Sequence, residues 1–172
     1  GLDYSVIIVG DREHPEVDAL LGYAGGQGIA LNSLEDVEKL PPLGRVCVVA
    51  QTTQTSGDYN LIVDKIRRIY PDAVVFNTIC SSTQERQAEV VALAREMDAV
   101  FIVGGRNSAN TKRLADLARR TNKPVFQIET ATEMENIKVN SYDRVGVSAG
   151  DSTPNWMMDR VMDRIAASRI AR

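Results

Sequence analysis

The chain has 172 residues, of which 44% are hydrophobic and 25% charged, and its formal net charge is −3. This composition can fill a core, and it argues against a general nucleic-acid-binding protein, which would need a basic face. No apolar run approaches the roughly 18–20 residues that span a bilayer, no signal peptide is visible, and two cysteines are too few for a disulfide framework, so we expect a cytoplasmic protein.

Short apolar runs that end in loop signals predict strands along the whole chain. In order they are "YSVIIVG" (4–10), "GIAL" (28–31), "RVCVVA" (45–50), "AVVFNTIC" (73–80), "AVFIVGG" (99–105), "PVFQI" (124–128) and "RVGVSAG" (144–150). The stretches between them show helical spacing, for example at Ile62, Ile66 and Ile69. Short buried strands that alternate with amphipathic helices predict parallel sheets with crossover connections.

The two halves of the chain also align with each other. "IIVGDREHPEVDALLGYA" matches "FIVGGRNSANTKRLADLA" at an offset of 94, and "VCVVAQTTQT" matches "VGVSAGDSTP" at an offset of 99. Between these pairs, "SLEDVEKL" corresponds to "ATEMENIK". We therefore predict an α/β fold of two duplicated three-layer α/β/α units with mostly parallel sheets, covering residues 1–70 and 71–172.

Polar clusters follow five of the predicted strands: "GDREHPE", "AQTTQT", "CSST", "GGRNSANT" and "SAGDSTP". In open parallel sheets, ligands bind beyond the carboxyl ends of the strands, where helix N-termini present free N–H groups. Hydroxyls, amides and backbone N–H groups suit an anion with many oxygens, such as a phosphate or a diphosphate. Positive charge is limited to Arg12, Arg106 and Lys112, so neutral donors and helix dipoles would do most of the binding.

Each of these residues also has a purely structural interpretation. Ser108 and Asn110 suit a helix N-terminus, and Pro15 suits a first helical turn that would contain Glu16. Glu16 is then either a helix-start acid or, if enclosed, a proton relay. The remaining residues of these loops read as turn or helix-start residues: Thr52, Thr53, Thr55, Ser152, Thr153 and Pro154.

The two cysteines occupy different contexts. Cys47 lies inside an apolar strand and is expected to be a small core residue. Cys80 precedes a helix, whose dipole stabilises a thiolate, so it is a candidate nucleophile, redox thiol or soft-metal ligand. A second cysteine close to Cys80 is missing, which excludes a CxxC pair, and a nucleophile would need His14 as its base. Spacing by itself does not indicate a metal.

The motifs together resemble the LytB family of 4-hydroxy-3-methylbut-2-enyl diphosphate (HMBPP) reductases, which catalyse the last step of the methylerythritol phosphate route to isoprenoids. The resemblance rests on "GDREHPEV", "AQTTQT", "ICSSTQERQ", "VGGRNSANTKRLADLA" and "VGVSAGDSTPNWMM", in the family's order. It implies three similar α/β domains with pseudo-three-fold symmetry around a central cavity. Each domain gives one cysteine to a [4Fe–4S] cluster, and ferredoxin or flavodoxin supplies electrons. The substrate's hydroxyl is removed to give isopentenyl and dimethylallyl diphosphate.

The same resemblance implies roles for individual residues. Cys80 would be a ligand of the cluster, and Glu16 would deliver protons to the leaving hydroxyl with the help of Thr53. Thr52 would line the pocket. The diphosphate would be held by His14, Ser108, Asn110 and Ser152.

Three departures from the family pattern qualify this interpretation. The family's first domain and two of the three cluster cysteines are expected to lie outside these residues, so we expect neither a stable cluster nor reductase activity from them alone. Ala109 stands where a second serine is common. Asp151 stands where a small neutral residue is usual, and it would repel diphosphate if it faced inward. A cluster-free diphosphate-binding or scaffold module is the alternative function, and a cysteine-nucleophile hydrolase is a third.

Overall fold

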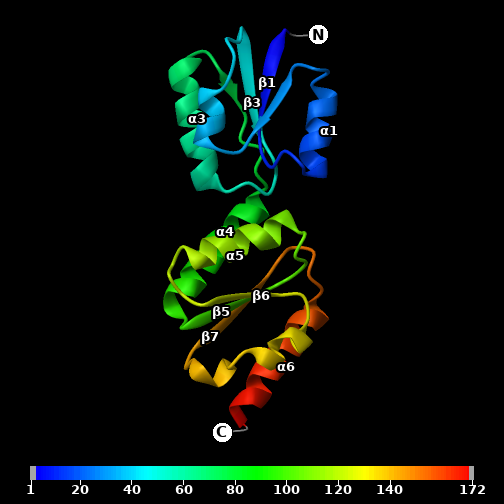
Figure 1. The fold of residues 1–172 in the computed structure, drawn as a ribbon, viewed down its shortest axis with the longest axis vertical. Helices are drawn as coiled ribbons and strands as arrows, with labels where there is room; N and C mark the ends of the chain where they lie inside the picture. The colour runs from blue at the N-terminus through cyan, green and yellow to red at the C-terminus, as the bar shows by residue number, and fades with distance from the viewer. Residues whose placement is uncertain (1–2, 171–172) are drawn as a thin grey trace. The chain divides into compact units, whose positions relative to one another are not determined.

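The computed structural model describes residues 3–170, and the chain divides into two compact units, residues 1–81 and 82–172. Each unit is built around its own parallel sheet (Figure 1). In the described part of the chain, no helix has the length and apolar character required to cross a membrane.

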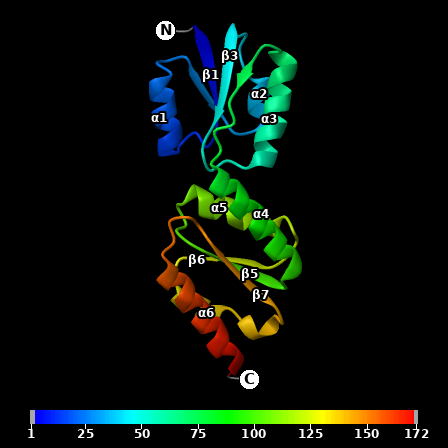
Figure 2. The same ribbon diagram turned by 180° about the vertical axis from the view of Figure 1, so that it is seen from behind.

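The first unit contains a four-stranded parallel sheet in the order β2-β1-β3-β4. The strands are β1 (Tyr4–Val9), β2 (Gly28–Leu31), β3 (Arg45–Ala50) and β4 (Val74–Val75), and the helices are α1 (Pro15–Tyr23), α2 (Leu34–Glu38) and α3 (Ser56–Ile69). Helix α1 covers one face of the sheet, and α2 and α3 cover the other (Figures 1 and 2). Ile62 and Ile66 of α3 are buried in the core against the sheet, as their spacing predicts.

The second unit contains a three-stranded parallel sheet in the order β6-β5-β7. The strands are β5 (Ala99–Val103), β6 (Val125–Ile128) and β7 (Val145–Ala149). The helices are α4 (Ser81–Glu96), α5 (Ala109–Arg119) and α6 (Asn155–Ile170), with the 3-10 helices η1 (Ala131–Asn136) and η2 (Val139–Ser141). Helix α4 begins one residue before the boundary between the units.

Strand β5 shows why this sheet needs helices on both faces. All five of its residues are buried. Val100 and Ile102 belong to the core under α4 and α5, whereas Phe101 and Val103 belong to the core under α6 and the 3-10 helices. A central parallel strand reads as a continuous apolar run because both of its faces are covered.

The registers of the two sheets confirm the internal duplication. Val9 pairs with Leu31 on one side and Ala50 on the other, and Val103 pairs in the same way with Ile128 and Ala149. Val103, Ile128 and Ala149 lie 94, 97 and 99 residues after their counterparts in the first sheet. The first and last of these offsets, 94 and 99, are the ones found in the repeated sequence motifs. The predicted fold class of duplicated α/β units with parallel sheets is therefore confirmed. A 3-10 helix, η1, takes the place of α2.

The boundary between the units differs from the predicted 70/71. The segment after residue 71 forms β4, which pairs with β3 through Cys47↔Val74 and Val48↔Val75. Its continuation stays with the first unit, because the Cys80 N–H donates to the Thr52 carbonyl at 2.9 Å. The boundary lies at 81/82, and Cys80 belongs to the first unit.

Candidate functional site

The loop after β1 leads directly into helix α1 at the carboxyl end of the first sheet. His14 is the N-cap of α1, and its Nδ1 accepts a hydrogen bond from the Glu16 N–H at 3.2 Å. Pro15 occupies the first helical turn, as predicted, because its missing N–H is no loss there. A neutral imidazole that accepts at Nδ1 carries its proton at Nε2, so His14 keeps a donor for a ligand.

Glu16 reaches from the first turn of α1 to the neighbouring loop after β3. Its Oε1 accepts from the Thr52 N–H at 2.7 Å, and its Oε2 accepts from the Thr52 hydroxyl at 2.9 Å. Glu16 is half-buried and Thr52 is exposed. Both carboxylate oxygens are therefore engaged by one residue, and the resulting pair faces the side of the sheet where ligands of parallel folds bind.

Thr52 and Thr53 form the centre of a turn that is closed by the Gln54 N–H donating to the Gln51 carbonyl at 3.0 Å. A turn of this kind points consecutive side chains in different directions. Thr52 faces Glu16, whereas the hydroxyl of Thr53 accepts a hydrogen bond from Gln51 Nε2 at 2.9 Å. The residue in contact with Glu16 is thus Thr52 rather than Thr53.

Gln51 is a residue that the sequence did not single out. Its side chain is fully buried, and its Oε1 accepts from the Asp11 N–H at 2.9 Å while its Nε2 holds Thr53. It therefore ties the loop after β1 to the loop after β3. Close packing adds to this link, because a Cβ at Gly10 would lie 2.7 Å from the Gln51 Cβ. The signal in the sequence was that Gly10 and Gln51 directly follow two strands, which turn out to be neighbours in the sheet.

The two cysteines differ in environment, but Cys47 is not the core residue that the sequence predicted. Cys80 is exposed at the start of α4, beside the loop that carries Thr52. Cys47 is half-buried in β3, and burial raises the pKa of its thiol. Within residues 3–170, no group of three or more histidine, cysteine, aspartate or glutamate side chains is arranged to hold a metal ion.

The second unit carries its own polar cluster at the carboxyl end of its sheet. Ser108 is the N-cap of α5, and its hydroxyl accepts from the Thr111 N–H at 3.3 Å. Asn110, in the first turn, is buried, with 6% of its surface exposed. Its Nδ2 donates to Asp151 Oδ2 at 2.8 Å. The structural role of Ser108 as a cap is therefore present, and capping leaves the hydroxyl hydrogen available to a ligand.

Asp151 has a second partner that the sequence did not indicate. Arg86, from α4, places its Nε 2.6 Å from Asp151 Oδ1, and its NH1 is 3.4 Å from the Ala149 carbonyl. Ser152 beside it is exposed, and the Thr153 hydroxyl anchors the loop by donating to the Val103 carbonyl at 3.0 Å.

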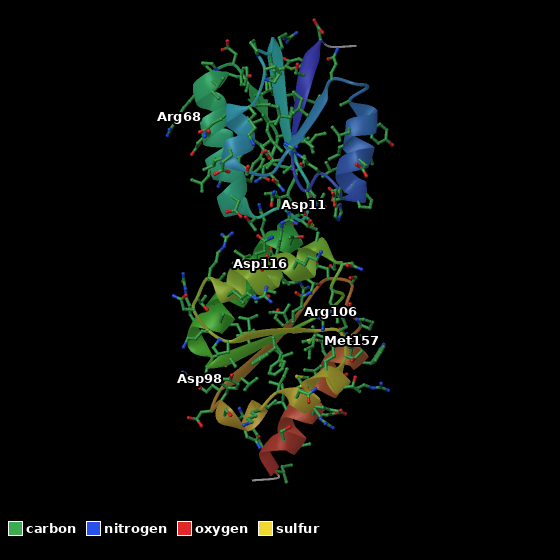
Figure 3. All side chains as sticks on the ribbon, viewed as in Figure 1. Asp11, Arg68, Asp98, Arg106, Asp116 and Met157 are labelled. Atoms are coloured by element: carbon green, nitrogen blue, oxygen red, sulfur yellow. The ribbon has the colours of Figure 1, made fainter. Side chains whose placement is uncertain are left out.

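The arginines proposed as anion ligands are paired with carboxylates. Arg12 lies 3.1 Å from Asp36, and Arg106 forms an ion pair with Glu133 of η1. Figure 3 shows Arg106 at the carboxyl edge of the second sheet, and Asp98 at the opposite edge. Both arginines are thus engaged by carboxylates, and the hydroxyls, amides and backbone N–H groups at the strand ends remain the predicted donors of an anion site.

The fold and the two clusters define a class of protein: duplicated parallel α/β units whose strand-end loops carry hydroxyl and amide side chains, a carboxylate–hydroxyl pair and an exposed thiol. The family model described as "LytB protein" matches residues 2–166. The chain therefore belongs to the LytB family, and the predicted resemblance is confirmed.

Two curated relatives of this chain carry the same name. The chain is 41% identical over 165 residues to the "4-hydroxy-3-methylbut-2-enyl diphosphate reductase" of Opitutus terrae, and 44% identical over 162 residues to that of Geobacter sulfurreducens. These matches cover 95% and 94% of this chain, and 57% of each relative. The chain thus spans little more than half the length of the curated relatives that it matches.

Two solved structures are similar to this chain. A reductase from Plasmodium falciparum, described as acting on E-1-hydroxy-2-methyl-but-2-enyl-4-diphosphate, matches with a TM-score of 0.88, covering 94% of this chain and 52% of that one. At 24% identity this likeness supports the fold alone. A second reductase, described as the terminal enzyme of the non-mevalonate pathway, is 40% identical with a TM-score of 0.52, covering 95% of this chain and 59% of that one.

Proposed function

We propose that this chain forms part of an HMBPP reductase, and that it supplies the proton-delivering group and part of the diphosphate site. The observation that carries the proposal is the Glu16 carboxylate, held through both oxygens by Thr52 at the strand end where Cys80 also lies. The names of the curated relatives support it. A simple diphosphate-binding protein would need neither the acid nor the thiol.

The leaving hydroxyl sets the chemical demand on Glu16. Hydroxide is a poor leaving group, so a proton must reach the oxygen as its bond to carbon breaks. Glu16 would hold this proton, and the Thr52 hydroxyl, 2.9 Å from Oε2, would bridge it to a substrate oxygen. We assign the bridging role to Thr52, and Thr53 then supports the turn through its bond to Gln51.

The diphosphate demands several donors and little additional charge. In the first unit, the outward Nε2–H of His14 and the N-terminus of α1 supply donors. In the second unit, the hydroxyls of Ser108 and Ser152 and the amide of Asn110 lie at the corresponding strand ends. Fixed neutral dipoles of this kind stabilise a multiply charged anion without adding mobile counter-charges.

An iron–sulfur cluster fits these residues only in part. Cubane clusters are held by several cysteine thiolates, and Cys80 is the one thiol that the structure places at a strand end within residues 3–170. When bound in a complete protein, the cluster would supply the electrons and a Lewis-acidic iron for the departing oxygen. Cys80 would be one of its ligands, and the other ligands and the family's first domain would come from outside this chain.

Binding is the first test of the proposal. Calorimetric titration with HMBPP should show binding that weakens about ten-fold in Ser152→Ala, because a hydrogen bond to a charged group is worth about 1.5 kcal/mol. Ser168→Ala is the matched control, because that hydroxyl, on α6, donates to the Arg164 carbonyl. Equal affinities for wild type and Ser152→Ala would show that Ser152 does not contribute to diphosphate binding.

The second test concerns the cofactor. After anaerobic reconstitution with iron and sulfide, we expect the isolated chain to lose its visible absorption when free iron is removed. A band that persists in the wild type and vanishes in Cys80→Ser would show that the chain holds a cluster after all. Ferredoxin or flavodoxin remains the expected electron donor, in a cytoplasm that keeps thiols reduced.

One observation supports the alternative function, a cluster-free diphosphate-binding module: Cys80 is the single thiol at the strand ends of the described residues. An experiment on a fusion protein distinguishes the two functions. In it, the segment of the Geobacter sulfurreducens relative that this chain does not cover is joined to this chain. Turnover of HMBPP with a chemical reductant, reduced at least 100-fold by Glu16→Gln, supports the reductase, because general acids contribute roughly 10²–10⁴-fold. Binding without turnover supports the module.

A further inference from the structure

Asp151 holds the donors that an anion would use at the carboxyl end of the second sheet. One of its oxygens accepts from the Asn110 amide at 2.8 Å, and the other lies 2.6 Å from the Arg86 guanidinium. The Asn110 side chain is almost completely buried, so it cannot turn freely toward another partner. Asn110 lies in the first turn of α5, so the carboxylate that it contacts is near the positive end of that helix dipole.

The arrangement makes Asp151 an internal stand-in for a bound anion. It has the right sign of charge, lies at a helix N-terminus and occupies a guanidinium and an amide at once. A carboxylate that is covalently part of the loop competes at a high effective concentration, since it needs no association step. Any free anion must therefore displace Asp151 from Asn110 and also approach its negative charge.

We propose that Asp151 is a specificity-determining residue that lowers the affinity of this strand end for polyanions by occupying Arg86 and Asn110. The proposal rests on the proposed diphosphate site of the second unit and adds the element that controls it. Asp151 and its partner Arg86 are both partly exposed, with side-chain exposures of 41% and 39%, so the carboxylate can move into solvent, whereas the Arg86 Nε and the Asn110 side chain are buried. The loop itself stays in place, because Thr153 anchors it to Val103.

The test uses inorganic pyrophosphate as the probe and Asp151→Asn as the main variant. Asparagine keeps the shape and can still accept from Asn110, so only the charge is lost. We expect Asp151→Asn to bind pyrophosphate about ten-fold more tightly than wild type at low salt. The gain should shrink below about three-fold near 1 M salt, where the screening length is about 3 Å. The matched control is Asp98→Asn, which removes a charge from an Asp–Arg pair at the opposite edge of the same sheet.

A second variant shows whether the released guanidinium is responsible. In the double variant Asp151→Asn/Arg86→Gln, the gain should disappear, because the cation that Asp151 had occupied is gone. Thermal unfolding of each variant checks that the unit remains folded before its affinity is compared.

The outcomes separate this inference from the function on which it rests. Tighter binding by Asp151→Asn and not by Asp98→Asn supports the inference, including the case in which wild type shows no binding. Wild-type binding that is unchanged or weakened in Asp151→Asn overturns the inference alone, since Asp151 would then be neutral or would position the donors. No binding by any of the proteins overturns the anion site of this unit and the inference together.

Discussion

Replacing Gln51 by leucine tests whether a buried amide holds the two loops of the first unit together. The substitution keeps the volume, so little cavity energy is involved. It removes the bond to the Asp11 N–H and the bond to the Thr53 hydroxyl, both 2.9 Å long. Each lost bond is worth about 1 kcal/mol, and a donor left unpaired costs about 1–3 kcal/mol. Because Asp11 and Thr53 are only half-buried and water can reach them in part, we expect a loss of about 2 kcal/mol.

Urea unfolding followed by far-UV circular dichroism measures this loss. Gln27→Leu is the control, since that side chain is exposed in the same unit and should change stability by less than about 0.5 kcal/mol. The only tryptophan, Trp156, lies in the second unit, so its fluorescence reports on that unit. Amide hydrogen exchange in β1 and β3 then locates the effect.

The interaction with Thr53 is isolated by a double-mutant cycle. Thr53→Val should destabilise the wild type, and it should cost at least about 0.5 kcal/mol less in the Gln51→Leu protein, because its partner is already gone. A destabilisation by Gln51→Leu no larger than that of Gln27→Leu would refute the reasoning. If the stability losses of Gln51→Leu and Thr53→Val simply add in the double variant, the hydrogen bond between Gln51 and Thr53 is refuted.

Three further predictions concern backbone geometry, pH and thiol reactivity. Gly104→Ala should destabilise the second unit by about 2–3 kcal/mol in thermal unfolding, because φ is +149° and a Cβ would lie 2.6 Å from the Thr111 hydroxyl; a loss below about 0.5 kcal/mol would contradict this. Burial raises the pKa of Glu133, but bonds from two backbone N–H groups and Arg106 outweigh it and hold the pKa below its ordinary 4.5. The stabilisation is therefore present above pH 4.5 and is lost as the pH falls below it, and Glu133→Gln should flatten this acid-side loss in urea titrations. Iodoacetamide should label Cys80 before Cys47, whose thiol is half-buried with a raised pKa, and mass spectrometry that found the reverse order would contradict the site.

Much of the architecture could be predicted from local chemistry alone. Alternating apolar runs predicted parallel sheets, and the offsets of the repeated motifs match the registers of β1 and β5 with their neighbours. The start of α1 at Pro15 and the cap at Ser108 also followed from residue type. The boundary of the first unit could not be predicted in this way, because β4 has two residues and only its pairing with β3 shows where it belongs.

The candidate site was likewise predicted only in part from the sequence. Residue types at strand ends were enough to nominate Glu16, Thr52 and Cys80, because parallel strands bring their carboxyl ends to one edge. Sequence alone did not decide which threonine meets Glu16, since that depends on the direction of each side chain in a turn. It also did not predict that Asp151 would meet Arg86, 65 residues earlier, because ion pairs between distant elements arise only when helices pack on a sheet. Local periodicity and capping are encoded by neighbours in the chain, whereas the partners of a charge are set by packing.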